Sequence, residues 1–272
     1  MAGWKCSVRG APEMPSRDTG ETAGAEVFSS ADALMRAAAE AFVRCAAESS
    51  KVSGRFAVAL SGGSTPASLY ALLATEAYAR RVDWSRVHVF WGDERCVPPG
   101  NPASNYRMAR ENLLAHVPVN AVNLHRVHGE DDPAEAAAAY ERELRQAFVT
   151  PGGPPRCTPG SRFDLVLLGM GDNGHIASLF PGMAAVQERE RWVMAQYIAT
   201  ASMWRVTLTP VVINAAAAVM FLVSGREKAT TLCRVLEGPY RPDELPAQVV
   251  APRAGCLRWL VDAAAAAELR RR

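Results

Sequence analysis

The sequence predicts a single α/β domain in which helices cover both faces of a doubly wound, largely parallel sheet of the Rossmann-like type. The first reason is size, because 272 residues, 49% of them apolar, can bury one large core. The second is order, because short runs that are apolar on both faces alternate with segments of helical spacing. The third is that glycine-rich and charged loops follow several predicted strands, where ligands bind in such folds.

The chain begins with a segment that we expect to lie outside the domain. Residues 1–25 lack periodicity and are rich in glycine, proline and small polar residues, which predicts a disordered or loosely attached tail. The domain is therefore expected over residues 26–272. Its first element is an amphipathic helix, since apolar residues recur at helical spacing across 33–45 and Ser30 or Asp32 can cap its start.

The order strand, polar loop, helix then recurs along the chain. Strands are expected at 55–60, 87–91, 122–127, 163–168, 192–199, 205–208, 219–223 and 257–260. Helices are expected at 67–79, 106–115, 133–148, 210–217, 226–236 and 261–271. Residues 151–160 are rich in glycine and proline, which predicts a surface loop within the same domain.

The balance of charge and hydropathy excludes several classes of partner. The 30 Lys and Arg residues against 28 Asp and Glu give a net charge of +2, too weak a field to favour nucleic acid or an anionic membrane. The longest apolar runs reach about half of the ~20 residues that span a bilayer, and the N-terminal segment lacks the apolar stretch of a secretory signal. We therefore expect a cytoplasmic protein that binds a compact polar small molecule, with no obligate protein partner.

The cysteines and histidines predict neither disulfide staples nor a metal centre. The six cysteines are too far apart for a CxxC pair, and we expect reduced thiols at 6, 45, 96, 157, 233 and 256. Cys96 adjoins a charged loop, but a lone cysteine beside an arginine is assigned no chemistry. The sequence has no His-Glu-x-x-His motif, cysteine cluster or Asp-rich calcium loop, so no metal is expected.

The first loop that carries chemistry is a turn of small residues between a predicted strand and a predicted helix. It consists of Ser61-Gly62-Gly63-Ser64-Thr65-Pro66. Its N–H groups meet at the positive end of the helix and can hold an anion such as phosphate. The turn lacks the Walker lysine and the GxGxxG pattern, so ATP and NAD are disfavoured. An ordinary tight turn would have the same composition, and both interpretations remain open at this point.

A second, charged loop follows the strand at 87–91. Asp93, Glu94 and Arg95 bring two carboxylates and a guanidinium to the same expected edge of the sheet, and arginine can grip phosphate or carboxylate with two hydrogen bonds. Solvated charges after a strand are common, so this loop alone is a weak signal. Residues 101–105 either cap the following helix or point polar groups at a ligand, and we favour the cap.

The third loop places a histidine directly after a glycine-rich segment. It spans 169–175 and ends at His175, which is hard to explain as a packing residue. Histidine can take a proton from water near neutral pH, so His175 is the predicted general base. No Gly-x-Ser-x-Gly elbow is present, and nothing near Ser64 in the sequence would make it a nucleophile. A water activated by His175 is the simpler chemistry.

Five segments together resemble the 6-phosphogluconolactonase family, in the family's order and at comparable separations. They are LSGGSTPASLY, WGDERCVPPGNPASNYRMARENLL, FDLVLLGMGDNGHIASLFPG, RVTLT and SGREKATTL, and the likeness runs from about residue 28 to 269. The resemblance implies hydrolysis of 6-phospho-D-glucono-1,5-lactone to 6-phospho-D-gluconate, the second step of the oxidative pentose phosphate pathway. It also implies that no metal or organic cofactor takes part.

The resemblance assigns roles to individual residues. It implies that the turn Gly62 to Thr65 holds the substrate phosphate, together with Arg205 of RVTLT and Lys228 of REKAT. The lactone ring would lie toward Asp93, Arg95 and His175. Phosphate binding would then orient the carbonyl carbon against a water held by the base. Either Arg95 or a backbone N–H of the 169–175 loop would stabilise the oxyanion.

One position departs from the family pattern. The family usually has Asp-Gly-His where this chain has Asn173-Gly174-His175, with Asp172 one place earlier. A carboxylate would orient the imidazole and stabilise its charged form, whereas an amide can only orient it. Asp172 remains a possible substitute. The residues before Arg205 also depart from the pattern, since 201–204 replace a proline-rich stretch.

Two other functions remain as alternatives. A glucosamine-6-phosphate deaminase-like isomerase would share the fold, the phosphate turn and the loop histidine. It should carry a glutamate a few residues after that histidine, where this chain has Leu179 and Phe180. A non-catalytic sugar-phosphate sensor is suggested only by Asn173, and the first 25 residues are too short and irregular for an output module.

Overall fold

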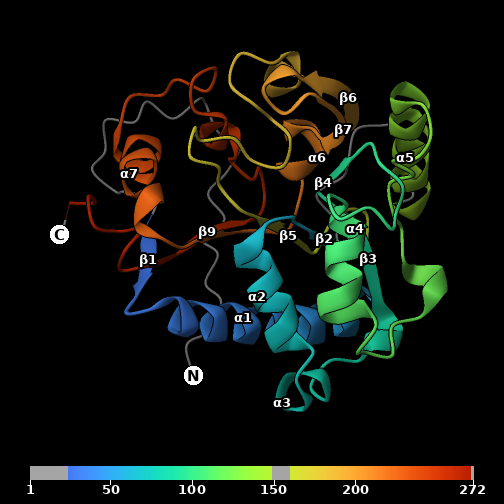
Figure 1. The fold of residues 1–272 in the computed structure, drawn as a ribbon. Helices are drawn as coiled ribbons and strands as arrows, with labels where there is room; N and C mark the ends of the chain where they lie inside the picture. Colours follow the sequence, from blue (N-terminus) through green and yellow to red (C-terminus); the bar gives the residue numbers. More distant parts are fainter. Residues whose placement is uncertain (1–23, 149–159, 271–272) are drawn as a thin grey trace.

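The computed structural model describes residues 24–148 and 160–270, and a parallel sheet forms its centre. Among these residues the sheet has six strands, in the spatial order β1 (Ala25–Phe28), β9 (Cys256–Asp262), β8 (Ala218–Val223), β5 (Leu165–Leu168), β2 (Phe56–Leu60) and β3 (Val87–Trp91). Each neighbouring pair is parallel (Figure 1). The predicted α/β class with a largely parallel sheet is therefore confirmed.

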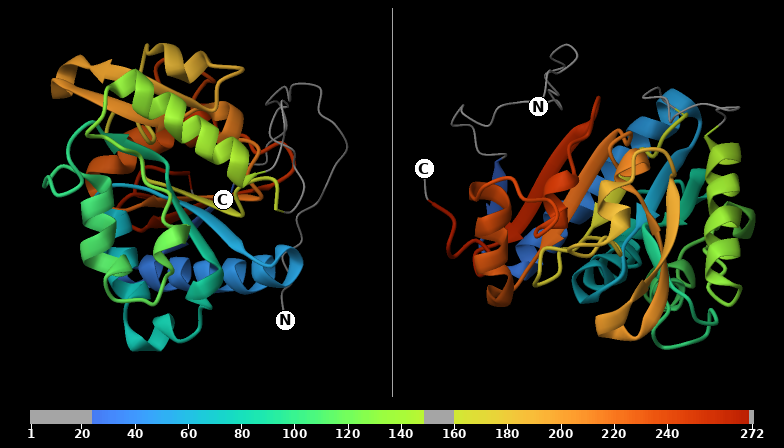
Figure 2. Two further views of the ribbon diagram at one scale, coloured as in Figure 1. Left: turned by 90° about the vertical axis from the view of Figure 1, so that its right-hand side faces the viewer. Right: turned by 90° about the horizontal axis from the view of Figure 1, so that it is seen from above.

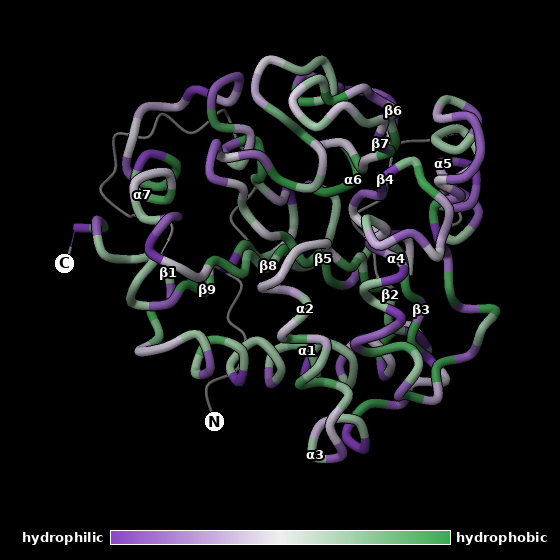
Figure 3. Tube along the Cα trace, viewed as in Figure 1, coloured by the Kyte–Doolittle hydropathy of each residue, from purple (hydrophilic) through white to green (hydrophobic). Residues whose placement is uncertain are grey.

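The strands of the central sheet divide their side chains between two cores. In β2, Phe56, Val58 and Leu60 pack into one cluster, while Ala57 and Ala59 pack into the other. Side chains alternate in direction along a strand, so a strand that is apolar at every position must be covered on both faces. Figure 2 shows helices on opposite faces of the sheet, and Figure 3 shows hydrophobic residues gathered along its strands.

The helices of the described residues overlap segments that were predicted to be helical. They are α1 (Ala31–Ser53), α2 (Ser64–Leu73), α3 (Glu76–Ala79), α4 (Asn105–Ala109), α5 (Pro133–Ala147), α6 (Pro210–Ile213) and α7 (Ala229–Glu237). A π-helical turn at Arg110–Leu114 continues α4, and short 3₁₀ turns occur at Trp84–Arg86, Ala121–Asn123, Ala184–Gln187, Ala199–Ala201, Arg226–Lys228 and Pro246–Val249. Ser30 is the N-cap of α1, because its side chain accepts the Ala33 N–H.

A second sheet was not predicted. It is antiparallel, and in the described part of the chain it has the order β4 (Asp93–Arg95), β7 (Met203–Leu208) and β6 (Val193–Ile198). The expectation that 93–95 belong to a loop is wrong. These charged residues have little strand propensity, and β4 forms because β7, more than 100 positions later, supplies a pairing partner.

Three further sequence expectations need correction. Residues 122–127 do not form a strand, since Leu124 makes only an isolated bridge to Val89 after a 3₁₀ turn. The helix expected at 67–79 starts at Ser64 and is interrupted after Leu73. The helix expected at 261–271 is absent over its described part, because β9 runs on to Asp262 through pairing with β8 and β1, and turns follow it.

The remaining expectations fall partly outside the described residues. Ala25 already begins β1, while 1–23 and most of the expected loop 151–160 lie outside. Three cysteines are free thiols as expected, namely Cys45, Cys96 and Cys233. The expectation is wrong for Cys256, which is disulfide-bonded, and Cys6 and Cys157 lie outside the described residues. No helix in 24–148 or 160–270 has the length and apolar character needed to cross a bilayer.

Candidate active site

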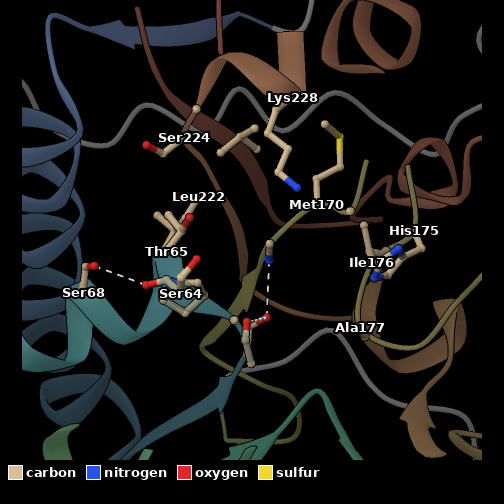
Figure 4. Close-up of a pocket in the computed structure, with 18 of the residues that line it drawn as sticks. Ser64, Thr65, Ser68, Met170, His175, Ile176, Ala177, Leu222, Ser224 and Lys228 are labelled. Atoms are coloured by element: carbon tan, nitrogen blue, oxygen red, sulfur yellow. Dashed lines mark hydrogen bonds between the residues drawn. The ribbon is translucent and has the colours of Figure 1, made fainter. Parts of the chain in front are cut away.

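A cavity of about 540 Å³ lies where the predicted loops meet. The chain passes from β2 outward to β3 and then returns to the other side of β2 to form β5, so the direction of winding changes between β2 and β5. Loops that leave such neighbours separate and open a crevice. Every site residue predicted from the sequence lines the cavity except Asn173. Figure 4 shows four of them, Ser64, Thr65, His175 and Lys228, around the cavity.

The glycine turn after β2 forms one wall and ends at the start of α2. Gly63 precedes the helix with a φ of 101°, a conformation that favours glycine, and its backbone is not capped by a side chain among the described residues. Gly62 packs against another lining residue, because a Cβ there would lie 2.1 Å from Asn105 Oδ1. The turn therefore leaves the first-turn N–H groups of α2 at the edge of the cavity, where they can bind an anion.

His175 is held by Asn173, two residues earlier. The Asn173 Oδ1 atom is 3.2 Å from the backbone N–H of His175 and 2.6 Å from its Nδ1. Because this atom accepts a backbone N–H, it is the amide oxygen, and Nδ1 must carry the proton that it also accepts. Nε2 is then the nitrogen with the free lone pair. The amide thus selects the tautomer in which Nε2 can act as a base.

Two neighbours fix the imidazole plane. Phe180 stacks on it with a centroid separation of 4.1 Å and an interplanar angle of 12°. On another side Gly171 approaches so closely that a Cβ there would lie 2.0 Å from His175 Nδ1. The glycine-rich composition of the loop is therefore required in part by the histidine itself.

The environment keeps His175 neutral. Burial, together with the positive charges of Arg205 and Lys228, lowers its pKa to about 4 against the opposing effect of Asp93. Asp172 is not a second hydrogen-bond partner of the imidazole, because its carboxylate forms an ion pair with Lys228. At neutral pH the imidazole can therefore accept a proton.

Asp93 and Glu94 are adjacent, yet they have different tasks. Asp93 is 5% exposed and lines the cavity, where Ser178 Oγ donates to its Oδ2 at 2.6 Å and Asn105 Nδ2 donates to its Oδ1 at 3.1 Å. Glu94 accepts the backbone N–H groups of Asn105 and Tyr106 at the start of α4. The alternation of side chains along β4 separates the two carboxylates. The sequence analysis placed both carboxylates in one charged loop, whereas only Asp93 lines the cavity.

Arg95 and Arg205 face each other across the β4–β7 pairing. Within the described residues, the buried Nε of each guanidinium has no hydrogen-bond partner. Like charges that are directly opposite in a sheet destabilise it, and buried donors without partners cost free energy. An anion bound in the cavity would remove both costs. The pair, with Lys228 and the α2 turn, makes the cavity strongly suited to an anionic ligand.

Ser178 and Phe180 were missed in the sequence, whereas Asn105 belongs to the segment 101–105, for which a helix cap was favoured over a contact with a ligand. Ser104 is the side-chain cap of α4, so Asn105 does not cap the helix but lines the cavity. Ser178 and Phe180 contact Asp93 and His175, yet they stand in an apolar run that reads as core. No local pattern marks them, because their partners come from other elements. No group of three or more His, Cys, Asp or Glu placed to hold a metal occurs among the described residues.

The fold and the site define an α/β domain with a cavity for a small anionic ligand and a neutral histidine positioned as a base. The chain belongs to the family described as glucosamine-6-phosphate isomerases/6-phosphogluconolactonase, whose model matches residues 29–259. It is 41% identical to the 6-phosphogluconolactonase of Nostoc sp. over 246 residues, which cover 90% of this chain and 97% of the relative. It is 35% identical to the 6-phosphogluconolactonase of Haemophilus influenzae, over 76% of this chain and 85% of the relative.

Solved structures agree with this placement. The 6-phosphogluconolactonase of Trypanosoma cruzi superimposes with a TM-score of 0.80 at 29% identity, covering 92% of this chain and 99% of that chain. A monomeric glucosamine-6-phosphate deaminase of the NagB superfamily has a TM-score of 0.73 at 19% identity, over 90% of this chain and 99% of that chain. The second likeness shows only that the fold is shared.

Proposed function

We propose that this protein is a 6-phosphogluconolactonase, which hydrolyses 6-phospho-D-glucono-1,5-lactone to 6-phospho-D-gluconate in the oxidative pentose phosphate pathway. The observation that carries the proposal is the Asn173–His175 pair, which presents a neutral Nε2 beside a cavity with several anion-binding groups. The named relatives, which match over most of their length, support the same activity. On the sequence grounds given above, we expect the reaction to take place in the cytoplasm.

The phosphate is bound at the α2 end of the cavity. The N–H groups of the turn at Gly62 to Thr65 offer hydrogen bonds and the helix dipole, while Arg205 and Lys228 supply charge. When the substrate binds, Lys228 gives up its ion pair with Asp172 and pairs with the phosphate instead. The phosphate is remote from the reacting carbon, so its binding energy serves to hold the lactone carbonyl near His175.

Hydrolysis proceeds by general base catalysis. Nε2 of His175 takes a proton from a water, whose oxygen attacks the lactone carbonyl carbon, and a tetrahedral oxyanion forms. The proton is then returned to the ring oxygen as the carbon–oxygen bond breaks. Two of the loop N–H groups, those of Gly171 and Gly174, are occupied within the loop, whereas the Nε of Arg95 has no partner among the described residues, which favours Arg95 as the donor to the oxyanion.

A direct assay tests the function. Purified protein is mixed with freshly prepared lactone at a pH where spontaneous opening is slow, and the rate is compared with a protein-free control. We expect enzymatic hydrolysis, and we expect His175→Ala to reduce kcat about 10²- to 10⁴-fold while it still binds 6-phosphogluconate. A fully active His175→Ala would contradict the mechanism and make Asp93 the candidate base.

The same preparation distinguishes the alternatives. Release of ammonia from glucosamine 6-phosphate would identify a deaminase, and tight sugar-phosphate binding without turnover would identify a sensor. The structure offers the deaminase no acid at the expected place, because Leu179 is fully buried and Phe180 stacks on His175. We therefore expect no ammonia above background.

A further inference from the structure

Ser178 has one polar contact with each strand of the second sheet. Its Oγ donates to Asp93 Oδ2 on β4 at 2.6 Å, and its N–H donates to Thr207 Oγ1 on β7 at 3.2 Å. Its carbonyl oxygen accepts a hydrogen bond from Gln196 Nε2 on β6. The residue is completely buried, so these contacts are shielded from competing water. The turn that carries Ser178 is thus fastened to all three strands.

The backbone of this turn is held in an unusual conformation. Ile176 and Leu179 pair with each other, and between them Ala177 has a φ of 45°, in the left-handed region that alanine rarely adopts. Strained residues of this kind persist where their surroundings require them. Here the strain places Ser178 against Asp93, only three positions after His175.

Arg205 lies just beyond hydrogen-bond distance of the same carboxylate oxygen. Its Nη1 atom is 3.9 Å from Asp93 Oδ2, the oxygen that Ser178 occupies. Its aromatic neighbour, Phe180, lies 5.5 Å from the guanidinium carbon and also stacks on His175. A direct Arg205–Asp93 pair would turn the donors of Arg205 away from the ligand.

We propose that Ser178 is a positioning residue that holds Asp93 away from Arg205 and so keeps the Arg205 guanidinium available to the substrate phosphate. The inference rests on the proposed function, which assigns Arg205 to the phosphate. Without the hydroxyl, Asp93 Oδ2 lacks its closest donor in a buried site, and the nearest replacement is Arg205. The Asp93 carboxylate and the Arg205 guanidinium then form a direct ion pair, and the affinity of the protein for the phosphate falls.

A double-mutant cycle tests this coupling, with 6-phosphogluconate binding measured by calorimetry. We expect Ser178→Ala to raise the Kd about tenfold, which is the range expected for loss of the charge-assisted hydrogen bond between Arg205 and the phosphate. We expect KM for the lactone to rise in parallel, with a smaller change in kcat. In an Asp93→Asn background the same substitution should change the Kd less than about twofold, because a neutral amide does not attract Arg205.

A matched control separates this effect from loss of stability. Thr209→Val removes an equally buried hydroxyl, which donates to the Arg191 carbonyl and does not line the cavity. It should lower the melting temperature as Ser178→Ala does, yet leave the product Kd unchanged. If Ser178→Ala does not fold, Ser178→Cys keeps the volume with a weaker donor and should weaken binding in the same direction.

An unchanged Kd in Ser178→Ala, or an equal loss in both backgrounds, would overturn the proposal. The wild-type protein is measured first, so failure of the proposed function is recognised separately. If it neither binds 6-phosphogluconate nor opens the lactone, that function is wrong. The same cycle with inorganic phosphate as the probe then still decides whether Ser178 acts through Asp93 and Arg205.

Discussion

The imidazole of His175 owes its chemical character to two neighbours and to burial, which act in different ways. Asn173 selects the tautomer, Phe180 covers one face, and burial lowers the pKa to about 4. A histidine with so low a pKa is almost entirely in its basic form at pH 7, but it is a weaker base than free imidazole. The site therefore keeps the base in its reactive neutral form, at the cost of a weaker base.

Asn173→Asp should shift the pH dependence of the reaction. A carboxylate at hydrogen-bond distance from Nδ1 stabilises the imidazolium, so the pKa of His175 rises by about one unit or more. Because the reaction needs the neutral form, the acidic limb of kcat/KM moves to higher pH, while activity at neutral pH is kept or increased. The pH–rate profiles of the two proteins are compared after the spontaneous rate is subtracted at each pH.

Asn173→Leu is the matched control for this shift. It fills a similar volume without an acceptor, so it should lower kcat without moving the acidic limb upward. An acidic limb that stays in place in Asn173→Asp would show that position 173 does not influence the titration of His175.

The loop after β5 is the element on which the position of the base depends. Gly171 has no unusual φ, so alanine is compatible with its backbone, and the cost of a Cβ would arise from contact with the His175 ring. We expect Gly171→Ala to displace the ring and lower kcat about tenfold or more, with little loss of product affinity. Steady-state kinetics and calorimetry measure the two effects separately.

Gly100→Ala provides the comparison, since a Cβ there meets nothing within 4 Å and the residue does not line the cavity. Its kinetics should match the wild type. Equal losses in kcat and in affinity for Gly171→Ala would indicate that the whole loop has moved, not the imidazole alone.

The β4–β7 pairing is the second element that builds the site, because it sets Arg95 opposite Arg205. Arg205→Ala and Lys228→Ala should each raise KM and the Kd for 6-phosphogluconate more than they lower kcat. The reason is that a phosphate contact is made equally in the ground state and the transition state. Arg86→Ala, on an exposed ion pair with Asp83, is the charge-matched control. Wild-type product affinity in either variant would remove that residue from the phosphate site.

For the molecule as a whole, a second, half-buried histidine links stability to pH. The Nδ1 atom of His88, on β3, is 3.1 Å from the Nε2 atom of His125, and the His125 ring is stacked on Phe90. Burial lowers the pKa of His88 from 6.5 to about 4. As the pH falls below 6.5 the unfolded chain binds a proton that the folded chain does not bind until about pH 4, so the free energy of unfolding decreases across this interval.

Replacing His88 should therefore flatten the pH dependence of stability. Between pH 6.5 and pH 4, the free energy of unfolding of His88→Gln should decrease less than that of the wild type. The expected difference is on the order of 1 kcal/mol, after allowance for solvent screening. Urea denaturation at several pH values measures it, with the wild type in the same buffers. Parallel curves for the two proteins would contradict the assignment.

Local sequence patterns were sufficient to predict several parts of the protein. Strands apolar at every position indicated a sheet covered on both faces, and Ser30 marked the start of α1. Glycine turns after β2 and β5 indicated the loops that meet at the cavity, because parallel strands end at one edge. His175 and its amide partner could be recognised because they are only two residues apart.

Which groups face one another at that edge depends on contacts between elements that are distant in the sequence. Charged residues 93–95 became a strand only because β7 pairs with them, and that pairing separated Asp93 from Glu94. Ser178 and Asn105 acquired their contacts with Asp93 from distant elements. Alanine-rich residues after β9 remained outside a helix because β8 and β1 hold the strand to Asp262. Long-range pairing and burial depend on the whole chain, so no local window of sequence contains them.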